Sequence, residues 1–228
     1  MITLPRFDRI PFLVHGFGDR ALTAADLRSG EPWRHFHAVS LRQVHSDTVH
    51  VVERAPRQSL LGDALVTGQA GLLLIIKSAD CLPVLIVDAD RRTVAAVHCG
   101  WRGTLAGVLE RTVNVMRERC GTAPGSILAG LGPCIGAACY EVGEDVRGRF
   151  AQAGLPQRLF RPAPDRPGKF LFDLAGANRL QLLHAGVREE NIFAAGLCTH
   201  CDPRLPSYRR DRQRAGRLLS FIGVTPGK

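Results

Sequence analysis

Two histidines and one cysteine each lie where an apolar run gives way to a turn. They are His45 in LRQVHSD, Cys81 in KSADCLP and His98 in VHCGWRG. If these turns converge in the folded chain, the three side chains offer a metal ion two imidazole nitrogens and one thiolate. Three such protein ligands leave the fourth tetrahedral position open, as in catalytic zinc sites. Spacing alone is a weak signal, because the three residues are far apart in the chain.

Polar residues flank two of these candidates. Asp80 precedes Cys81 and is suited either to orienting an imidazole or to accepting a proton near a bound ligand. Arg42 and Gln43 precede His45, and the alternation of a strand places Gln43 on the face of His45 and Arg42 on the opposite face. The alternatives are a turn residue that caps its own backbone for Asp80 and a surface side chain for Arg42.

The segment CGWRG follows His98 directly and predicts a tight turn before a helix. Free amide groups at a helix N-terminus favour an anion, and Arg102 adds a planar pair of donors that suits phosphate or carboxylate. We therefore interpret this turn as an anion site. In the alternative interpretation the glycines only form the turn, and Arg102 faces solvent.

The first half of the chain is rich in Val, Ile and Leu and predicts several strands before the first long helix. The expected strands are 37–44, 48–53, 63–67, 72–77, 82–88 and 93–98. From Leu105 the apolar residues take helical spacing, and Gly121 is a typical stop. This order predicts a mixed α/β (α+β) fold.

The second half of the chain continues the mixed pattern. It contains an apolar run at 126–131 and predicts a helix at 141–152, a surface loop at 161–168 (RPAPDRPG), and strands at 192–196 and 217–222. Asp173 is suited to capping a further helix that ends at Gly186. With 228 residues and 45% hydrophobic content, we expect residues 1–228 to form one domain.

Composition narrows the function classes. The chain has 30 Lys and Arg against 21 Asp and Glu, a net charge of +9, which suits anionic ligands; specific nucleic-acid binding is not expected, because no recognition signature is present. The longest apolar stretch, 71–89, contains Lys77 and Asp80 and does not predict a membrane span. Seven cysteines and a charged N-terminal segment predict reduced thiols and a cytoplasmic location. CTHC at 198–201 is a CxxC pair without a second one, and we interpret it as a loop.

Taken in order, several motifs span nearly the whole chain and resemble the laccase-domain proteins, variously called polyphenol oxidase, peptidoglycan editing factor or purine nucleoside phosphorylase. The matching segments are HGF at 15–17, RQVHS at 42–46, GDALVT at 62–67, SADCLPVLI at 78–86, VAAVHCGWRGTLAGVLE at 94–110, LGPCIGAACYEVGEDV at 131–146, FDLAGANRLQLLHAGV at 172–187 and SYRRD at 207–211.

The resemblance implies a four-layer α/β/β/α fold with mixed sheets, related to putative cysteine hydrolases. It also implies a zinc ion held by His45, Cys81 and His98, phosphorolysis of adenosine, inosine and methylthioadenosine, and deamination of adenosine. Arg20 lies where the family has an early arginine, but ALTAADL replaces the Gly-Gly-Val-Ser that usually follows. Arg209 carries over from the family's Phe-Ser-Tyr-Arg-Arg, although the aromatic residue before the serine does not. Cys99 stands where the family commonly has alanine.

The expected partners are therefore a purine nucleoside and inorganic phosphate, with phosphate oriented by arginines such as Arg42 and Arg102, and the protein is expected to be a monomer or weak homodimer. One alternative is a metal-free thiol hydrolase that uses Cys81 with His98 or His45 as the base. Another is a copper-dependent phenol oxidase, although two methionines and a single HxH at 35–37 offer few copper ligands. A zinc-binding protein without enzymatic activity is the last.

Overall fold

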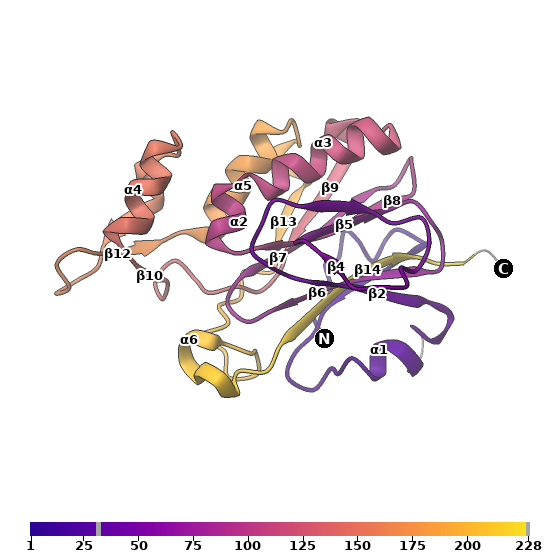
Figure 1. Cartoon of the computed structure of the whole chain (residues 1–228), viewed down its shortest axis with the longest axis horizontal. Coiled ribbons are helices and arrows are strands. Elements are labelled where there is room, and N and C mark those ends of the chain that lie inside the picture. Colours follow the sequence, from indigo (N-terminus) through magenta and orange to yellow (C-terminus); the bar gives the residue numbers. More distant parts are fainter. Residues whose placement is uncertain (31–32, 227–228) are drawn as a thin grey trace.

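The structure, a computed structural model, describes residues 1–30 and 33–226. Two sheets lie face to face, and helices cover their outer faces (Figure 1). The upper helices are α2 (Trp101–Leu105), α3 (Val108–Cys120) and α5 (Leu174–His184), and α1 (Asp26–Ser29) lies beneath the lower sheet. The expected mixed α/β fold is confirmed, and the layers follow the order α/β/β/α.

The upper sheet has the strand order β13-β9-β7-β8-β5-β3 and contains parallel and antiparallel pairs. Its strands are β3 (Val49–Val51), β5 (Ala64–Thr67), β7 (Leu82–Asp88), β8 (Thr93–Cys99), β9 (Ile127–Leu131) and β13 (Ile192–Ala194). Every residue of β7 and β8 is buried, because helices cover one face of this sheet and the other sheet covers the second.

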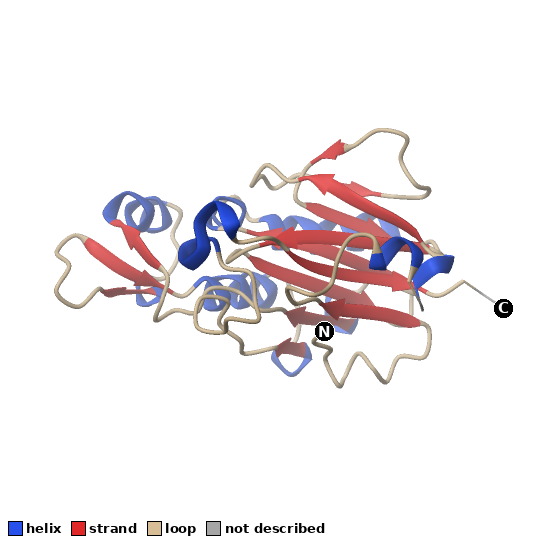
Figure 2. Ribbon diagram, turned by 90° about the horizontal axis from the view of Figure 1, so that it is seen from below, coloured by secondary structure: helices blue, strands red, loops and turns tan. Residues whose placement is uncertain are grey.

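The lower sheet has the order β1-β14-β6-β2-β4. Its strands are β1 (Leu13–Phe17), β2 (His37–Arg42), β4 (Leu60–Leu61), β6 (Leu72–Ser78) and β14 (Leu218–Val224). A small third sheet lies with α4 (Glu144–Gln152) to one side of the sandwich in both views (Figure 2). Its strand order is β10 (Glu141–Gly143), β12 (Lys169–Phe172) and β11 (Phe160–Pro162). The helix α6 (Tyr208–Asp211) precedes β14.

Side-chain alternation divides the core into layers. In β8, Val97 packs with α3 and α5, whereas Val94 and Ala96 pack between the two sheets. A strand has a period of two, so His98 shares the inter-sheet face with Val94 and Ala96. His98 is the last residue of β8 on this face, and its side chain is therefore directed to the space between the sheets at their edge.

The register brings several strand ends to this same edge. β2 and β6 are parallel, and β14 runs antiparallel to β6 with Leu218 opposite Ser78. The short link 79–81 carries the chain from the end of β6 in the lower sheet to the start of β7 in the upper sheet. Opposite that start, Leu82 pairs with Cys99 at the end of β8. The ends of β2, β6 and β8 and the starts of β7 and β14 thus surround one opening.

Some sequence predictions are wrong at element boundaries. The helix expected from Leu105 begins at Val108, and a separate short helix, α2, ends at Leu105, because Gly107 between them has a φ of +79°. The helix expected at 141–152 begins at Glu144, because 141–143 pairs with β12. The segment 161–168, predicted as a loop, begins in strand β11. The strands β1, β4 and β12 were not predicted. The cap at Asp173 is confirmed, since its side chain accepts a hydrogen bond from the amide of Gly176 at 2.8 Å.

Candidate metal centre

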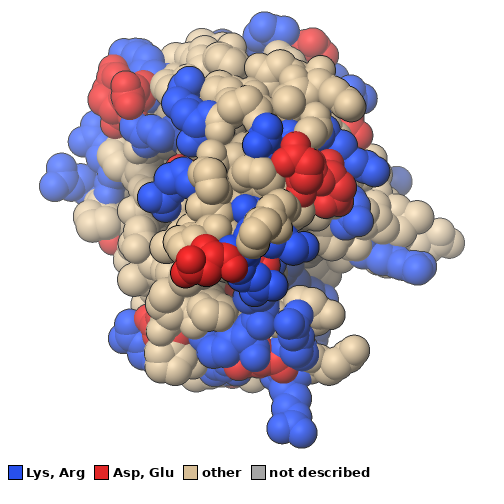
Figure 3. All heavy atoms as spheres, turned by 90° about the vertical axis from the view of Figure 1, so that its left-hand side faces the viewer, with Lys and Arg blue, Asp and Glu red and all other residues tan. Residues whose placement is uncertain are grey.

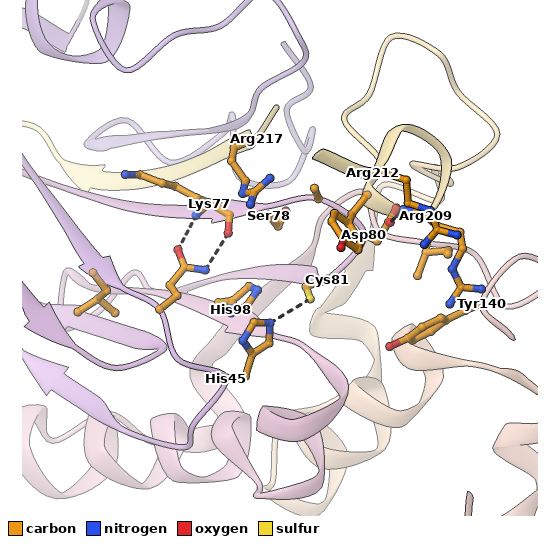
Figure 4. A pocket seen from close by; sticks show the side chains of 15 residues that line it. His45, Lys77, Ser78, Asp80, Cys81, His98, Tyr140, Arg209, Arg212 and Arg217 are labelled. Carbon is orange, nitrogen blue, oxygen red and sulfur yellow. Dashed lines mark hydrogen bonds between the residues drawn. The ribbon is translucent and has the colours of Figure 1, made fainter. Parts of the chain in front are cut away.

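The structure brings His45, Cys81 and His98 together at the opening between the sheets (Figure 4). Their ligand atoms all lie within 4.8 Å of one another. The Cys81 Sγ is 3.9 Å from the His45 Nε2, and the two imidazole rings meet edge to face with centroids 4.9 Å apart. The predicted convergence of three distant turns is therefore present, while metal binding itself stays a prediction.

A buried carboxylate shapes the loop that carries His45. Asp63, which lies just before β5, accepts hydrogen bonds from the backbone amides of Val44, His45 and Ser46 at 3.2, 3.0 and 2.6 Å. The hydroxyl of Ser46 donates to the same carboxylate at 2.9 Å. These bonds hold His45 in the left-handed region, with a φ of 61°, a conformation that is uncommon for residues other than glycine.

The same carboxylate orients the second imidazole. The Asp63 Oδ1 lies 2.8 Å from the His98 Nδ1, so that the Nε2 of His98 is the nitrogen left for a ligand. A carboxylate behind a metal-binding imidazole is a common arrangement, because it fixes the tautomer and raises the basicity of the ligand. Asp63 lies within GDALVT, but no role was predicted for it from the sequence. Its position directly before the apolar run 64–66 was the available signal.

The charges of this cluster are strongly coupled. Burial opposes ionisation of Cys81, but hydrogen bonds with His45 and His98 outweigh it and lower the pKa of the thiol to about 6. Burial likewise lowers the pKa of His98, yet Asp63 and Cys81 raise it overall to about 9. Burial disfavours the Asp63 anion, and the bonds from His98 and Ser46 nevertheless bring its pKa to about 2. The cluster therefore favours a thiolate beside a histidine that hydrogen-bonds a carboxylate.

Gly100 leaves the room that the cluster needs. A Cβ at this position would lie 2.7 Å from the His45 Cδ2 and 3.1 Å from the Cys81 Sγ, while the Gly100 φ of −79° is open to any residue. Gly100→Ala is therefore expected to lower zinc affinity by roughly 10- to 100-fold through displaced ligands, measured by competition with a chromophoric chelator. Gly148→Ala is the matched control, because a Cβ there meets nothing within 4 Å. Equal zinc affinity in both variants would contradict this account.

A cavity of about 570 Å³ opens beside the cluster. Basic side chains from two segments face it, and one carboxylate, that of Asp80, lies among them (Figure 4). Its lining is Leu41, Gln43, His45, Lys77, Ser78, Ala79, Asp80, Cys81, His98, Ile135, Tyr140, Tyr208, Arg209, Arg212 and Arg217. The size is within the range of cavities that bind small molecules, and the charge favours an anionic group.

Three of the predicted site residues line this cavity in addition to the metal candidates. The side-chain amide of Gln43 donates to the carbonyl of Lys77 at 2.7 Å, and its oxygen accepts from the Lys77 amide at 2.8 Å. The Asp80 carboxylate accepts from the Thr199 hydroxyl at 2.7 Å and from the Arg209 amide at 2.6 Å. Gln43 and Asp80 thus connect neighbouring strands and loops at the cavity wall. Arg209 lies on the same wall.

The other predicted anion-binding residues lie elsewhere. Among the described residues that line the cavity, Arg20, Arg42 and Arg102 are absent. Arg20 pairs with Asp211 and donates from its Nε to the carbonyl of Pro203 at 2.9 Å. The guanidinium of Arg102 stacks over the ring of Trp101 at 4.4 Å. Their assignment to substrate stays a prediction without a place in the cavity.

Three of the four described Lys and Arg residues that line the cavity, Lys77, Arg212 and Arg217, were not among the predicted site residues. Lys77 and Arg217 lie close in the structure because the register of β6 and β14 pairs Leu218 with Ser78, a contact between segments far apart in sequence. Arg212 and Arg209 come from the Arg-rich segment before β14. Arg209 was predicted from the resemblance at SYRRD, whereas Arg212 was not, because only the folding of this segment brings it to the cavity.

The surface of the chain carries the excess of basic charge. Figure 3 views the side toward which α4 and α6 lie, and Lys and Arg side chains crowd its lower part. Within residues 1–30 and 33–226, no helix has both the length and the apolar character that crossing a bilayer requires.

Comparison with known proteins identifies a family and several relatives of this chain. Residues 21–225 match the family described as multi-copper polyphenol oxidoreductase laccase. A Deinococcus radiodurans protein named purine nucleoside phosphorylase is 41% identical over 184 residues, 81% of this chain and 69% of that protein. The purine nucleoside phosphorylase YfiH of Shigella flexneri is 35% identical over 232 residues, 97% of this chain and 88% of its own.

A solved structure gives the same answer for the fold. The crystal structure of YlmD from Geobacillus stearothermophilus matches with a TM-score of 0.86 and 30% identity, over 98% of this chain and 94% of that one. The resemblance found in the sequence is thereby confirmed, and the chain belongs to the laccase-domain family.

Proposed function

We propose that this protein is a zinc-dependent purine nucleoside phosphorylase that acts on adenosine, inosine and methylthioadenosine, with adenosine deaminase as a side activity. The observation that carries the proposal is one cavity that combines a metal-type donor set on one wall, His45, Cys81 and His98, with cationic side chains on the other. The names of the Deinococcus radiodurans and Shigella flexneri relatives support it.

The donor set fits zinc. Two imidazoles and one thiolate are the ligand types that zinc prefers, and three protein ligands keep a position open for substrate or water. Asp63 holds the His98 Nδ1, so that the Nε2 is presented to an ion. A bound zinc ion supplies Lewis acidity and an acidified water at this wall. Copper is the alternative ion, since imidazole and thiolate also bind it.

The other groups of the cavity suit phosphate and a purine. Lys77, Arg209, Arg212 and Arg217 hold and orient phosphate, whose oxygen attacks the anomeric carbon of the ribose as the bond to the purine nitrogen breaks. The purine leaves with the electron pair of that bond and requires a proton. Preorganised cations lower the energy of such a transition state because they need no reorganisation. Tyr140 offers its ring to the base, and Asp80 is placed to move a proton.

Incubation of metal-analysed protein with adenosine, with and without phosphate, tests the proposal. Adenine and ribose 1-phosphate that appear only with phosphate, separated by chromatography, are the expected products. Inosine formed without phosphate would make the proposed deaminase side activity the main one, with water as the nucleophile. The absence of both sets of products would contradict the proposal.

Arg217→Ala is expected to raise the KM for phosphate about tenfold, because a hydrogen bond to a charged group contributes about 1.5 kcal/mol. The KM for the nucleoside is expected to change less, since Arg217 would contact phosphate alone. Arg214→Ala is the control, as Arg214 is exposed and lies outside the described lining of the cavity. Steady-state kinetics with phosphate varied at saturating nucleoside measure the effect. An equal KM in both variants would remove Arg217 from the phosphate site.

A metal-free thiol hydrolase is the second candidate, favoured by Cys81 lying beside His45 and His98. Cys81 would then attack an amide or ester carbon, and a histidine would return a proton to the leaving group. Chelation separates the two functions. A preparation without metal that keeps full activity and loses it on Cys81→Ser would establish the thiol enzyme.

A further inference from the structure

Three cysteines form a cluster of their own beside the proposed site. The sulfur atoms of Cys139, Cys198 and Cys201 lie within 4.8 Å of one another, and those of Cys139 and Cys201 are 3.4 Å apart. All three are free thiols, and none is among the described residues that line the cavity. The mechanism proposed above uses none of them.

The backbone, and not chance side-chain positions, brings two of these thiols together. Cys198 and Cys201 are the ends of CTHC, which forms a turn after β13, closed by a hydrogen bond from the amide of Asp202 to the carbonyl of Cys198 at 3.0 Å. Two cysteines separated by two residues in a turn have the spacing of zinc knuckles. From the sequence we interpreted this pair as a loop, because the chain has no second CxxC.

The third thiol comes from a distant segment that is tied to the same turn. Cys139 lies in a turn, and its own amide donates to the carbonyl of Gly136 at 2.8 Å. A parallel bridge joins Cys134 to Cys198, and the amide of Thr199 donates to the carbonyl of Cys134 at 2.9 Å. The convergence of Cys139 with the CTHC turn is therefore fixed by main-chain pairing.

One of the sulfur atoms is also held as an acceptor. The amide of Gly136 donates to the Cys198 Sγ at 3.1 Å, a bond that favours the thiolate over the thiol. A Cβ on Gly136 would lie 3.2 Å from this sulfur, so the glycine permits the close approach. Hydrogen bonds to cysteine sulfurs also occur in metal–thiolate centres, where they tune the properties of the metal.

We propose that Cys139, Cys198 and Cys201 bind a thiophilic d10 cation, Zn²⁺ or Cu⁺, as a second metal centre of this protein. Soft thiolate ligands select such ions. Each thiol that ligates gives its proton to solvent as a metal–sulfur bond forms, and no oxidation or reduction is involved. For zinc, a solvent molecule completes the tetrahedron.

The second centre fixes the wall of the cavity that faces the first. Tyr140, which follows Cys139, lines the cavity, and Thr199, within the CTHC turn, donates to the Asp80 carboxylate at 2.7 Å. The Arg210 guanidinium also donates to the carbonyls of Thr199 and His200 at 2.7 and 2.9 Å. A cation that joins both turns therefore restrains the positions of Tyr140 and Asp80.

The test uses the His45→Asn variant of the full chain, which lacks one ligand of the first centre. Asparagine is chosen because it tolerates the positive φ of this position. The reduced variant is loaded anaerobically with Zn²⁺ or with Cu⁺, desalted and analysed for metal and by X-ray absorption. We expect about one cation retained per chain, with sulfur neighbours dominating its coordination and, for zinc, bond lengths near 2.3 Å.

Adding Cys198→Ser and Cys201→Ser to His45→Asn is expected to lower the affinity for that cation at least about 100-fold. The control adds Cys120→Ser to His45→Asn and is expected to leave the affinity unchanged, because Cys120 is a free cysteine at the end of α3. Cys139→Ser serves as a second variant if the double one fails to fold by circular dichroism. Any of three results overturns the proposal: no retained cation in the reduced His45→Asn variant, retention that survives loss of Cys198 and Cys201, or a coordination sphere without sulfur. The readout is independent of nucleoside turnover, so failure here leaves the proposed function standing.

Discussion

Replacing His98 by alanine is expected to abolish metal retention at the first centre and nucleoside turnover together. His98 is buried, its Nδ1 is held by Asp63, and its Nε2 is the ligand atom that the cluster offers. Its removal leaves two ligands, one of them on the exposed loop of His45, which is too few to retain zinc. We expect the affinity for zinc at this centre to fall by more than about 100-fold, measured by chelator competition, with turnover lost to the same extent.

His98→Ala also leaves the Asp63 carboxylate without its imidazole partner, so a loss of stability must be separated from a loss of the ligand. His98→Asn does this, because the asparagine amide takes the place of the Nδ1–H and lacks the Nε2. We expect His98→Asn to melt near the wild type and still lose the metal. His37→Ala is the control, since His37 is exposed on β2. Normal zinc content and normal rates in His98→Asn would remove the site assignment.

The fold was predictable from the sequence wherever one physical signal dominated. The apolar runs of β6, β7 and β8 are buried on both faces, and a continuous apolar run of this length is typical of such strands. Boundaries were predicted poorly where a partner decides them. Glu141 has the propensity for a helix, yet it pairs with Leu171, and a propensity worth tenths of a kcal/mol yields to a ladder of tertiary contacts.

The candidate metal centre was predictable because ligand chemistry narrows the choice of residue types, and strand ends narrow their positions. The residues behind and around it were not, for a different reason. The role of Asp63 depends on a loop that folds back over a carboxylate, and the place of Arg217 depends on the register of β14. Neither feature has a local signal in the sequence. The third cysteine of the second cluster was missed likewise, because Cys139 has no fixed spacing from CTHC.

Asp63→Asn is expected to reduce both stability and metal affinity. We expect this effect to be second in size only to that of His98→Ala. The buried carboxylate accepts bonds from three consecutive amides, a hydroxyl and an imidazole. An asparagine has one acceptor oxygen, and its amide group would oppose at least one of these donors. Breaking a buried charge pair costs about 3 to 5 kcal/mol, and a lost partner behind a metal-binding histidine lowers metal affinity about 10- to 100-fold.

The matched control is Asp88→Asn, a buried carboxylate at the far end of β7 that accepts from the amides of Asp90 and Arg91 at 3.1 and 3.3 Å. It is expected to destabilise the fold without changing zinc affinity. Urea denaturation and chelator competition measure the two quantities, and an Asp63→Asn variant with the zinc affinity of Asp88→Asn would show that Asp63 does not orient His98.

The acid dependence of stability separates the anion of Asp63 from its shape. Its pKa in the folded protein is about 2, below the value of about 3.9 in an unfolded chain. A lowered pKa means that the unfolded state binds more protons, so the contribution of Asp63 is complete above about pH 4 and is lost as the pH falls toward 2. Asp63→Asn has no carboxylate at this position and therefore no such contribution to lose. Its urea midpoint is expected to fall less steeply than that of the wild type over this interval. Parallel slopes would mean that the carboxylate is not ionised where it lies, and the bonds that hold His45 and His98 would then need another origin.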